Sequence, residues 1–147
     1  MANYTEVQET ESVLAQVPHY DVVVGLVTRG QSEVLVARRK PQCQHAGRLE
    51  FPGGKRESGE SRVEALAREL YEEVGITSII SQPLIQCVYT YPTHQVSLDC
   101  WLVTEFVGEP YSKEGQEVFW VPISDLKAHE FLSANQGVIS ALQDAIA

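Results

Sequence analysis

Residues 61–76 place the strongest constraint on the fold, because they have the marks of an amphipathic helix at both ends. Ser61, followed three residues later by Glu64, forms a capping box, so the helix is expected to begin at about Arg62. Gly75 suits the position after the helix, where the backbone turns left-handed. One flank should pack on a core, because apolar side chains recur at helical spacing at Val63, Leu66, Leu70 and Val74.

Three carboxylates share the neighbouring flank of this helix. At 3.6 residues per turn, Glu69, Glu72 and Glu73 fall within an arc of about 100°. Acidic runs on helices are usually solvated, but Glu69 forms like-charge pairs with both of the others. Each pair costs about 0.2–0.5 kcal/mol in an isolated helix. Arg68 can relieve only part of this repulsion, so the spacing favours a bound divalent cation.

The residues around the helix also match a family pattern. Five residues separate Gly54 from Glu60, and seven more precede Arg-Glu-Leu-x-Glu-Glu-x-Gly-Ile at 68–76. Every fixed position of the Nudix box is present, and the frequency of a chance match is on the order of 10⁻⁷. The chain therefore resembles the Nudix hydrolases over about residues 20–142. Leu-Glu-Phe-Pro-Gly-Gly-Lys at 49–55 is similar to the MutT branch, which hydrolyses oxidised purine nucleoside triphosphates.

The resemblance implies a divalent-metal site built mainly from carboxylates. Mg²⁺ is the expected cofactor, with Mn²⁺ able to replace it, because such cations prefer oxygen ligands. Glu114, in a hydrophilic Lys-Glu-Gly-Gln loop, is either a solvated acid or, as in MutT, a ligand or base. The implied ligands are the main-chain carbonyl of Gly53 and the side chains of Glu69, Glu72, Glu73 and Glu114.

Catalytic roles are implied for four residues near the start of the helix. Glu69 is expected as a ligand or as the general base. Glu60 and Arg68 would pair and tie the preceding loop to the helix, and Lys55 would contact the leaving phosphates. The metal would lower the pKa of the attacking water and neutralise phosphate oxygens.

The rest of the chain fits an α/β fold, and the Nudix resemblance implies a mixed β-sheet sandwiched between α-helices. Residues 20–147 are expected to form a single domain, and residues 1–19 an N-terminal extension. The expected elements outside the motif helix are strands at 20–28, 33–39, 84–91, 95–106 and 118–121, a helical turn at 124–127 and a helix at 134–146.

Composition excludes several classes of partner. The net charge of −9 argues against binding a nucleic-acid polymer, but a free nucleotide can arrive with its own Mg²⁺. No apolar run is long enough to span a membrane, and the N-terminus does not resemble a secretory signal. The three cysteines suggest reduced thiols, and with them a cytoplasmic protein. Monomer and dimer both remain open.

Recognition of the base is expected from residues outside the helix. The Asn135 amide can donate and accept hydrogen bonds at a guanine-like edge, as in MutT, or it can cap the last helix. Tyr91 and Phe51 correspond to aromatic residues of the MutT base pocket, although ordinary packing would also explain them. Arg39 matches a MutT arginine near the nucleotide.

The expected substrate contacts also include residues that lie within the matched segment 49–55 and residues that differ from the MutT pattern. Glu50 and Pro52 belong to the matched segment 49–55. Gln44 stands where the MutT pattern has a histidine, and His94 where it has an arginine. Thr93 replaces an aspartate of the pattern, so base preference is open at this segment.

The leading hypothesis is a Mg²⁺-dependent nucleoside triphosphate pyrophosphohydrolase. It would convert 8-oxo-dGTP, and dGTP to some extent, to the monophosphate and pyrophosphate, with water attacking the β-phosphorus. One alternative is the same reaction on CTP or other pyrimidine nucleotides, or on another nucleoside diphosphate derivative. A non-catalytic nucleotide-binding module is disfavoured, because such modules usually lose box glutamates and all are present here.

Loss of Glu69 or Glu73 is expected to lower activity on the order of 10³-fold, as removal of a general base or metal ligand typically does. Steady-state turnover of Glu73→Gln at saturating Mg²⁺ tests this expectation. Near-normal turnover would contradict it.

Overall fold

The computed structural model describes residues 17–146, so most of the expected N-terminal extension lies outside the described residues. In the described residues, four strands precede the first helix, three strands follow it, and two short 3₁₀ turns lead to the last helix. The strands are β1 (His19–Arg29), β2 (Glu33–Arg38), β3 (Leu49–Glu50), β4 (Gly53–Lys55), β5 (Thr77–Thr90), β6 (Gln95–Val107) and β7 (Glu117–Pro122). The helices are α2 (Arg62–Val74) and α3 (Ser133–Ile146), and the 3₁₀ turns are η1 (Ile123–Asp125) and η2 (Ala128–Glu130).

The strands form one mixed sheet in the order β3-β2-β1-β6-β5. Strand β1 runs parallel to β6, whereas its other partners are antiparallel. Its pairing changes along its length: residues 22–24 pair with β4, and only Thr28 and Arg29 pair with β2. Strands β1 and β2 are therefore not paired along the first half of β1, and β4 pairs with β1 there instead.

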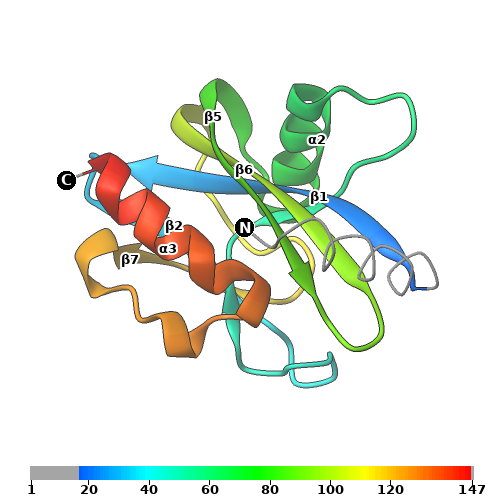
Figure 1. The fold of residues 1–147 in the computed structure, drawn as a ribbon. Helices are drawn as coiled ribbons and strands as arrows, with labels where there is room; N and C mark the ends of the chain where they lie inside the picture. The colour runs from blue at the N-terminus through cyan, green and yellow to red at the C-terminus, as the bar shows by residue number, and fades with distance from the viewer. Residues whose placement is uncertain (1–16, 147) are drawn as a thin grey trace.

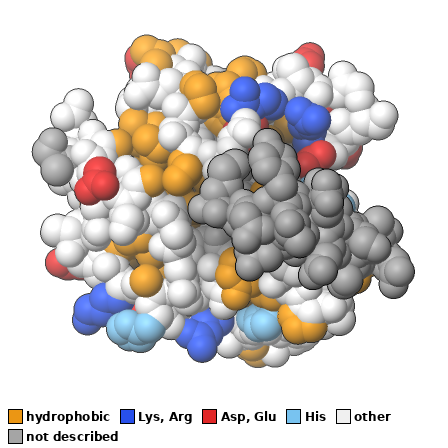
Figure 2. Space-filling view, in the orientation of Figure 1, with side chains coloured by type: hydrophobic (Ala, Val, Ile, Leu, Met, Phe, Trp, Pro, Cys, Tyr) orange, Lys and Arg blue, Asp and Glu red, His pale blue; other side chains and the backbone are white. Residues whose placement is uncertain are grey.

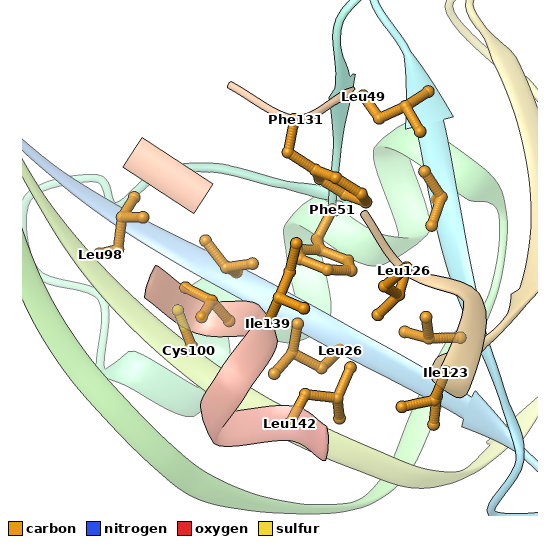
Figure 3. Close-up of a cluster of buried hydrophobic side chains, with 14 of the residues drawn as sticks. Leu26, Leu49, Phe51, Leu98, Cys100, Ile123, Leu126, Phe131, Ile139 and Leu142 are labelled. Atoms are coloured by element: carbon orange, nitrogen blue, oxygen red, sulfur yellow. The ribbon is translucent and has the colours of Figure 1, made fainter. Parts of the chain in front are cut away.

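Helices α2 and α3 pack on opposite faces of the sheet (Figure 1). Neighbouring residues of β1 point to opposite faces, as expected for a strand. Leu26 belongs to the core that includes Ile139 and Leu142 of α3 (Figure 3). Val27 belongs to the core that includes the buried leucines of α2. The prediction of a mixed sheet between helices is confirmed.

Both predicted ends of α2 are confirmed. The Ser61 side chain accepts a hydrogen bond from the Glu64 N–H, and the Glu64 carboxylate accepts one from the Ser61 N–H. Gly75 has φ 74° and donates its N–H to the Tyr71 carbonyl. The prediction that Val63 belongs to the buried stripe is wrong, because its exposed fraction is 50%. The buried face includes Ala65 and Glu73, which leaves Val63 at its outer edge in the first turn.

Two further differences concern irregular segments. Strand β5 begins at Thr77 rather than at residue 84 and contains irregularities on either side of Pro83. Proline is tolerated there because β5 is at the edge of the sheet, where an N–H is dispensable. The 3₁₀ turn η2 was not expected from the sequence.

The cysteines of the described residues are free, as expected from the sequence. Cys43, Cys87 and Cys100 are free thiols. Between residues 17 and 146, no helix has the length and hydropathy needed to cross a membrane. On the face seen in Figure 2, apolar side chains lie in separate small groups, which is ordinary for a protein surface.

A salt bridge fastens the start of α2 to β6. The Arg62 guanidinium donates to both Asp99 carboxylate oxygens, at 2.6 and 2.9 Å. Burial of Asp99 opposes its ionisation, but the hydrogen bonds and charge of Arg62, together with weaker contacts from Trp101 and Gln86, outweigh burial, so the pKa of Asp99 lies below its usual value. A depressed pKa stabilises the fold above the unfolded pKa, and this contribution is lost as pH falls through the folded pKa.

Asp99→Asn is therefore expected to lower the Tm by a few degrees at pH 7. The difference from wild type should shrink below about pH 4, where the unfolded carboxyl also takes up a proton. Thermal melts across this pH range provide the measurement, with Glu117→Gln as the control. Glu117 pairs with Arg38 at an exposed site, so its loss should change the Tm little. A pH-independent difference for Asp99→Asn would contradict the assignment.

Candidate active site

The glycine pair of β4 brings the backbone into direct contact with α2. A Cβ on Gly53 would lie 2.1 Å from the Val23 carbonyl oxygen of β1. A Cβ on Gly54 would lie 2.2 Å from the Glu69 carboxylate. Position 53 therefore requires glycine because a Cβ there meets backbone, whereas a side chain at Gly54 would have to displace the Glu69 carboxylate, which rests directly on the β4 backbone.

Glu73 is a buried carboxylate at the centre of the site, with an exposed fraction of 8%. One of its oxygens accepts a hydrogen bond from the Gly53 N–H at 2.9 Å. Burial, together with the nearby carboxylates of Glu50, Glu114 and Glu69, raises the pKa of Glu73 to about 8 against this hydrogen bond. A cation placed among these groups would favour the ionised form.

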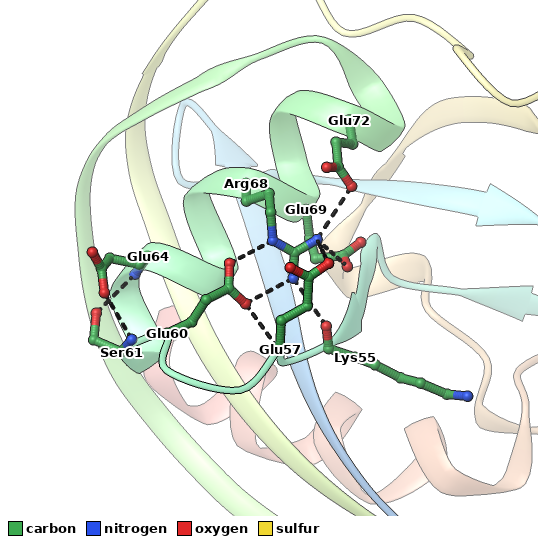
Figure 4. A network of polar contacts seen from close by, with 8 residues as sticks. All are labelled: Lys55, Glu57, Glu60, Ser61, Glu64, Arg68, Glu69 and Glu72. Atoms are coloured by element: carbon green, nitrogen blue, oxygen red, sulfur yellow. Dashed lines mark hydrogen bonds and ion pairs between the residues drawn. The ribbon is translucent and has the colours of Figure 1, made fainter.

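Arg68 links the loop to the carboxylates of the helix (Figure 4). Its guanidinium donates to both oxygens of Glu60, at 2.5 and 2.9 Å, so the expected pair is present. It also donates to Glu69 at 2.9 Å, to Glu72 at 3.2 Å and to the Lys55 carbonyl at 3.0 Å. The hydrogen bonds from Arg68 lower the pKa of Glu60 to about 2. Glu60 is therefore an ionised structural partner of Arg68.

The Lys55 ammonium lies away from these carboxylates. In Figure 4 its side chain extends out of the network, although its carbonyl belongs to it. The Nζ atom lies 4.0 Å from the centre of the Tyr20 ring, a cation–π contact. Its expected contact with the leaving phosphates stays a prediction.

The donor chemistry fits a divalent cation. Glu69 and Glu114 are close enough to Glu73 to raise its pKa, and Gly53 lies beside it. Among the described residues, however, no three acidic, histidine or cysteine side chains are grouped as a ready coordination shell. The reason is visible in the contacts: Arg68 holds Glu69 and Glu72, and the Gly53 N–H holds Glu73. A bound cation would compete with these partners.

A cavity of about 410 Å³ adjoins the carboxylates. It brings together the predicted metal residues Gly53, Glu73 and Glu114 with seven of the predicted substrate residues, namely Arg39, Gln44, Glu50, Phe51, Tyr91, His94 and Asn135. Pro52 does not line the cavity, because it is buried and its carbonyl accepts a hydrogen bond from the Gly25 N–H. Glu69 and Glu72 lie outside the lining, although Glu69 touches Gly54 at its edge.

Asn135 and Phe51 meet at one end of the cavity. The Asn135 Oδ1 accepts a hydrogen bond from the Phe51 N–H at 3.2 Å, and the exposed fraction of Asn135 is 6%. Helix α3 already begins at Ser133, so Asn135 lies inside the first turn and does not cap the helix. The Phe51 ring stacks on Phe131, with centroids 5.0 Å apart, and is itself largely core.

Tyr91 and His94, at the tip of the β5–β6 hairpin, also line the cavity. Their rings stack with centroids 4.7 Å apart. His45 also lines the cavity, with its ring centroid 6.1 Å from that of Tyr91, and its backbone is left-handed at φ 58°. Sequence reasoning missed His45 because its loop has no periodicity. It also missed the apolar floor of Val22, Val24, Val96 and Leu98, because these strand residues look like ordinary core.

Arg39 organises the side of the cavity next to the carboxylates. It donates to the Glu50 carboxylate at 3.1 Å and to the Gln44 carbonyl at 2.8 Å. Burial raises the pKa of Glu50, and Arg39 opposes the shift. The Gln44 loop is therefore fixed through its backbone, and its side chain is not required for that contact.

Comparisons with known proteins agree with this geometry. The model of the NUDIX domain family matches residues 18–142. An 8-oxo-dGTP diphosphatase of Escherichia coli K12 is 39% identical over 122 residues, covering 83% of this chain and 95% of that protein. A CTP pyrophosphohydrolase of the same organism is 34% identical over 100 residues, covering 68% and 73%. A solved MutT structure, from work on Aliivibrio salmonicida and Vibrio cholerae, has a TM-score of 0.74 at 36% identity and covers 86% and 98%.

Gly54→Ala is expected to displace the Glu69 carboxylate and to lower turnover about 10²-fold, because small misplacements of reacting groups have effects of this size. Steady-state rates and thermal melts would measure the change. Gly137→Ala is the matched control, since a Cβ there meets nothing within 4 Å and an alanine suits a helix. It should keep the wild-type rate and raise stability slightly. Wild-type turnover by Gly54→Ala would show that the contact with Glu69 is dispensable.

Proposed function

This chain belongs to the Nudix family, and from that premise we propose that it hydrolyses 8-oxo-dGTP to the monophosphate and pyrophosphate, with dGTP as a poorer substrate. We place this activity in the cytoplasm, where it would remove oxidised nucleotides before DNA synthesis. The relatives named 8-oxo-dGTP diphosphatase support the substrate, since this chain covers nearly the whole of the E. coli protein.

One observation of the structure supports the proposal most directly. A single cavity joins a purine-compatible end, with Asn135 and Phe51, to the carboxylates that would meet the phosphates, Glu73 and Glu114. Its volume of about 410 Å³ is typical of small-molecule sites. The amide of Asn135 can both donate and accept, as recognition of a guanine-like edge requires.

Mg²⁺ is the proposed cofactor, held by the Gly53 carbonyl and by carboxylates among Glu69, Glu72, Glu73 and Glu114. When bound, it would lower the pKa of the attacking water and neutralise phosphate oxygens. Mn²⁺ would serve with the same oxygen ligands.

The residues of the chain have separable roles in this reaction. Glu69 would take the proton of the water that attacks the β-phosphorus, and Arg68 holds Glu69 in place through its hydrogen bond. The bond between the β-phosphorus and the oxygen that bridges it to the α-phosphorus breaks, and the nucleoside monophosphate leaves with that oxygen. Glu60 anchors Arg68 from the loop, so it acts by positioning.

Hydrolysis of CTP or a modified pyrimidine nucleotide is the second candidate. The relative named CTP pyrophosphohydrolase supports it, as does His94 at the rim of the cavity, where the MutT pattern has arginine. A pyrimidine is smaller than a purine, so a bound pyrimidine base would leave the end of the cavity near Asn135 unfilled. The two candidates share the phosphate chemistry and differ in the nucleoside.

Initial rates with 8-oxo-dGTP, dGTP, CTP and ADP-ribose, together with product identification, test the proposal. We expect kcat/KM to be highest for 8-oxo-dGTP, pyrophosphate and monophosphate to be the products, and EDTA to abolish turnover until Mg²⁺ is restored. A kcat/KM for 8-oxo-dGTP no higher than for dGTP would refute the oxidised-purine assignment and leave the hydrolase intact. Failure to hydrolyse any nucleotide with Mg²⁺ would refute both.

A further inference from the structure

One of the backbone N–H groups at the N-terminus of α3 donates a hydrogen bond to a side chain from outside the helix. A helix leaves its first N–H groups without partners inside the helix, and a Ser, Thr, Asp or Asn before it usually accepts from one of them. Leu132 precedes α3 and has no acceptor in its side chain. The Ala134 N–H instead donates to the Tyr91 hydroxyl at 3.2 Å. The tip of the β5–β6 hairpin therefore caps α3.

The capped residue is directly beside Asn135. The Asn135 Oδ1 in turn accepts from the Phe51 N–H at 3.2 Å. Tyr91, Ala134, Asn135 and Phe51 thus connect the hairpin to the segment before the glycine pair, and they surround one end of the cavity. All four lie in the partly or fully buried part of the molecule, where a missing hydrogen bond is costly.

We propose that the Tyr91 hydroxyl is a positioning group for base selection: by capping α3 through Ala134, it fixes the amide of Asn135 toward the nucleobase. This inference rests on the proposed function, because it deepens the role of the same cavity. The hydroxyl is distinct from the ring, which stacks on His94 at 4.7 Å and packs on Tyr89 at 4.8 Å. Tyr91→Phe removes the cap and keeps these ring contacts.

Kinetics of Tyr91→Phe with Mg²⁺ provide the test. We expect kcat/KM for 8-oxo-dGTP to fall about tenfold, mostly through a higher KM, because one hydrogen bond that orders the amide is lost. The decrease for dGTP should be smaller, so the ratio of the two kcat/KM values falls. Tyr89→Phe removes a hydroxyl from the neighbouring ring of the same hairpin, which is 38% exposed, and should keep the wild-type ratio.

A double-mutant cycle with Asn135→Ala separates positioning from a general loss of stability. If Tyr91 acts through Asn135, Tyr91→Phe should have no further effect on the substrate ratio in the Asn135→Ala background. An unchanged ratio for Tyr91→Phe alone, or fully additive effects in the cycle, would overturn the inference.

Amide hydrogen exchange in the free protein gives a readout that does not depend on the substrate. Tyr91→Phe should speed exchange at Ala134 and also at Phe51, since a loosened Asn135 no longer holds the Phe51 N–H. Faster exchange at Ala134 alone would indicate a purely local cap and overturn the proposed link to Asn135. If the wild-type protein does not hydrolyse 8-oxo-dGTP, the proposed function fails, while the exchange experiment still decides whether the hydroxyl positions Asn135.

Discussion

The contact between the glycine pair of β4 and the carboxylates of α2 is the constraint on which the site depends. Gly53 lies against β1 on one side and donates its N–H to Glu73 on the other. Gly54 leaves no room for a side chain between its backbone and Glu69. These contacts place two acidic side chains at one edge of the cavity although each would be solvated in an isolated helix. Burial and the neighbouring carboxylates disfavour the ionised form of Glu73, so the surrounding fold must hold this carboxyl group in place.

Arg68 is the internal counter-charge of the carboxylates beside the β4 glycines. Its five donors can serve several carboxylates at fixed geometry, which lysine cannot do. It bonds Glu60 in the loop as well as Glu69 and Glu72 in the helix. The same residue therefore connects the loop to the helix and limits the repulsion within the helix. The structural and electrostatic roles of the Nudix arginine are inseparable in this chain.

Features set by local rules could be predicted from the sequence, and features set by tertiary contacts could not. The capping box at Ser61 and the left-handed Gly75 depend on neighbouring residues, so both ends of α2 were predicted correctly. The burial of Val63 depends on how the helix is rotated against the sheet, which spacing alone does not determine. His45 enters the cavity through a left-handed turn with no sequence signature. The capping of Ala134 by Tyr91 joins residues 43 positions apart and is visible only in the fold.

The split pairing of β1 has a consequence for how such a protein can diverge. Because β4 replaces β2 along the first half of β1, the β4 glycines lie beside the strand residues that line the cavity. The apolar lining, including Phe51 and Leu98, belongs to the core shared with α3, whereas none of the described residues of the core beneath α2 line the cavity. Substitutions in the core shared with α3 can thus reshape the nucleotide preference while the core beneath α2 keeps its packing.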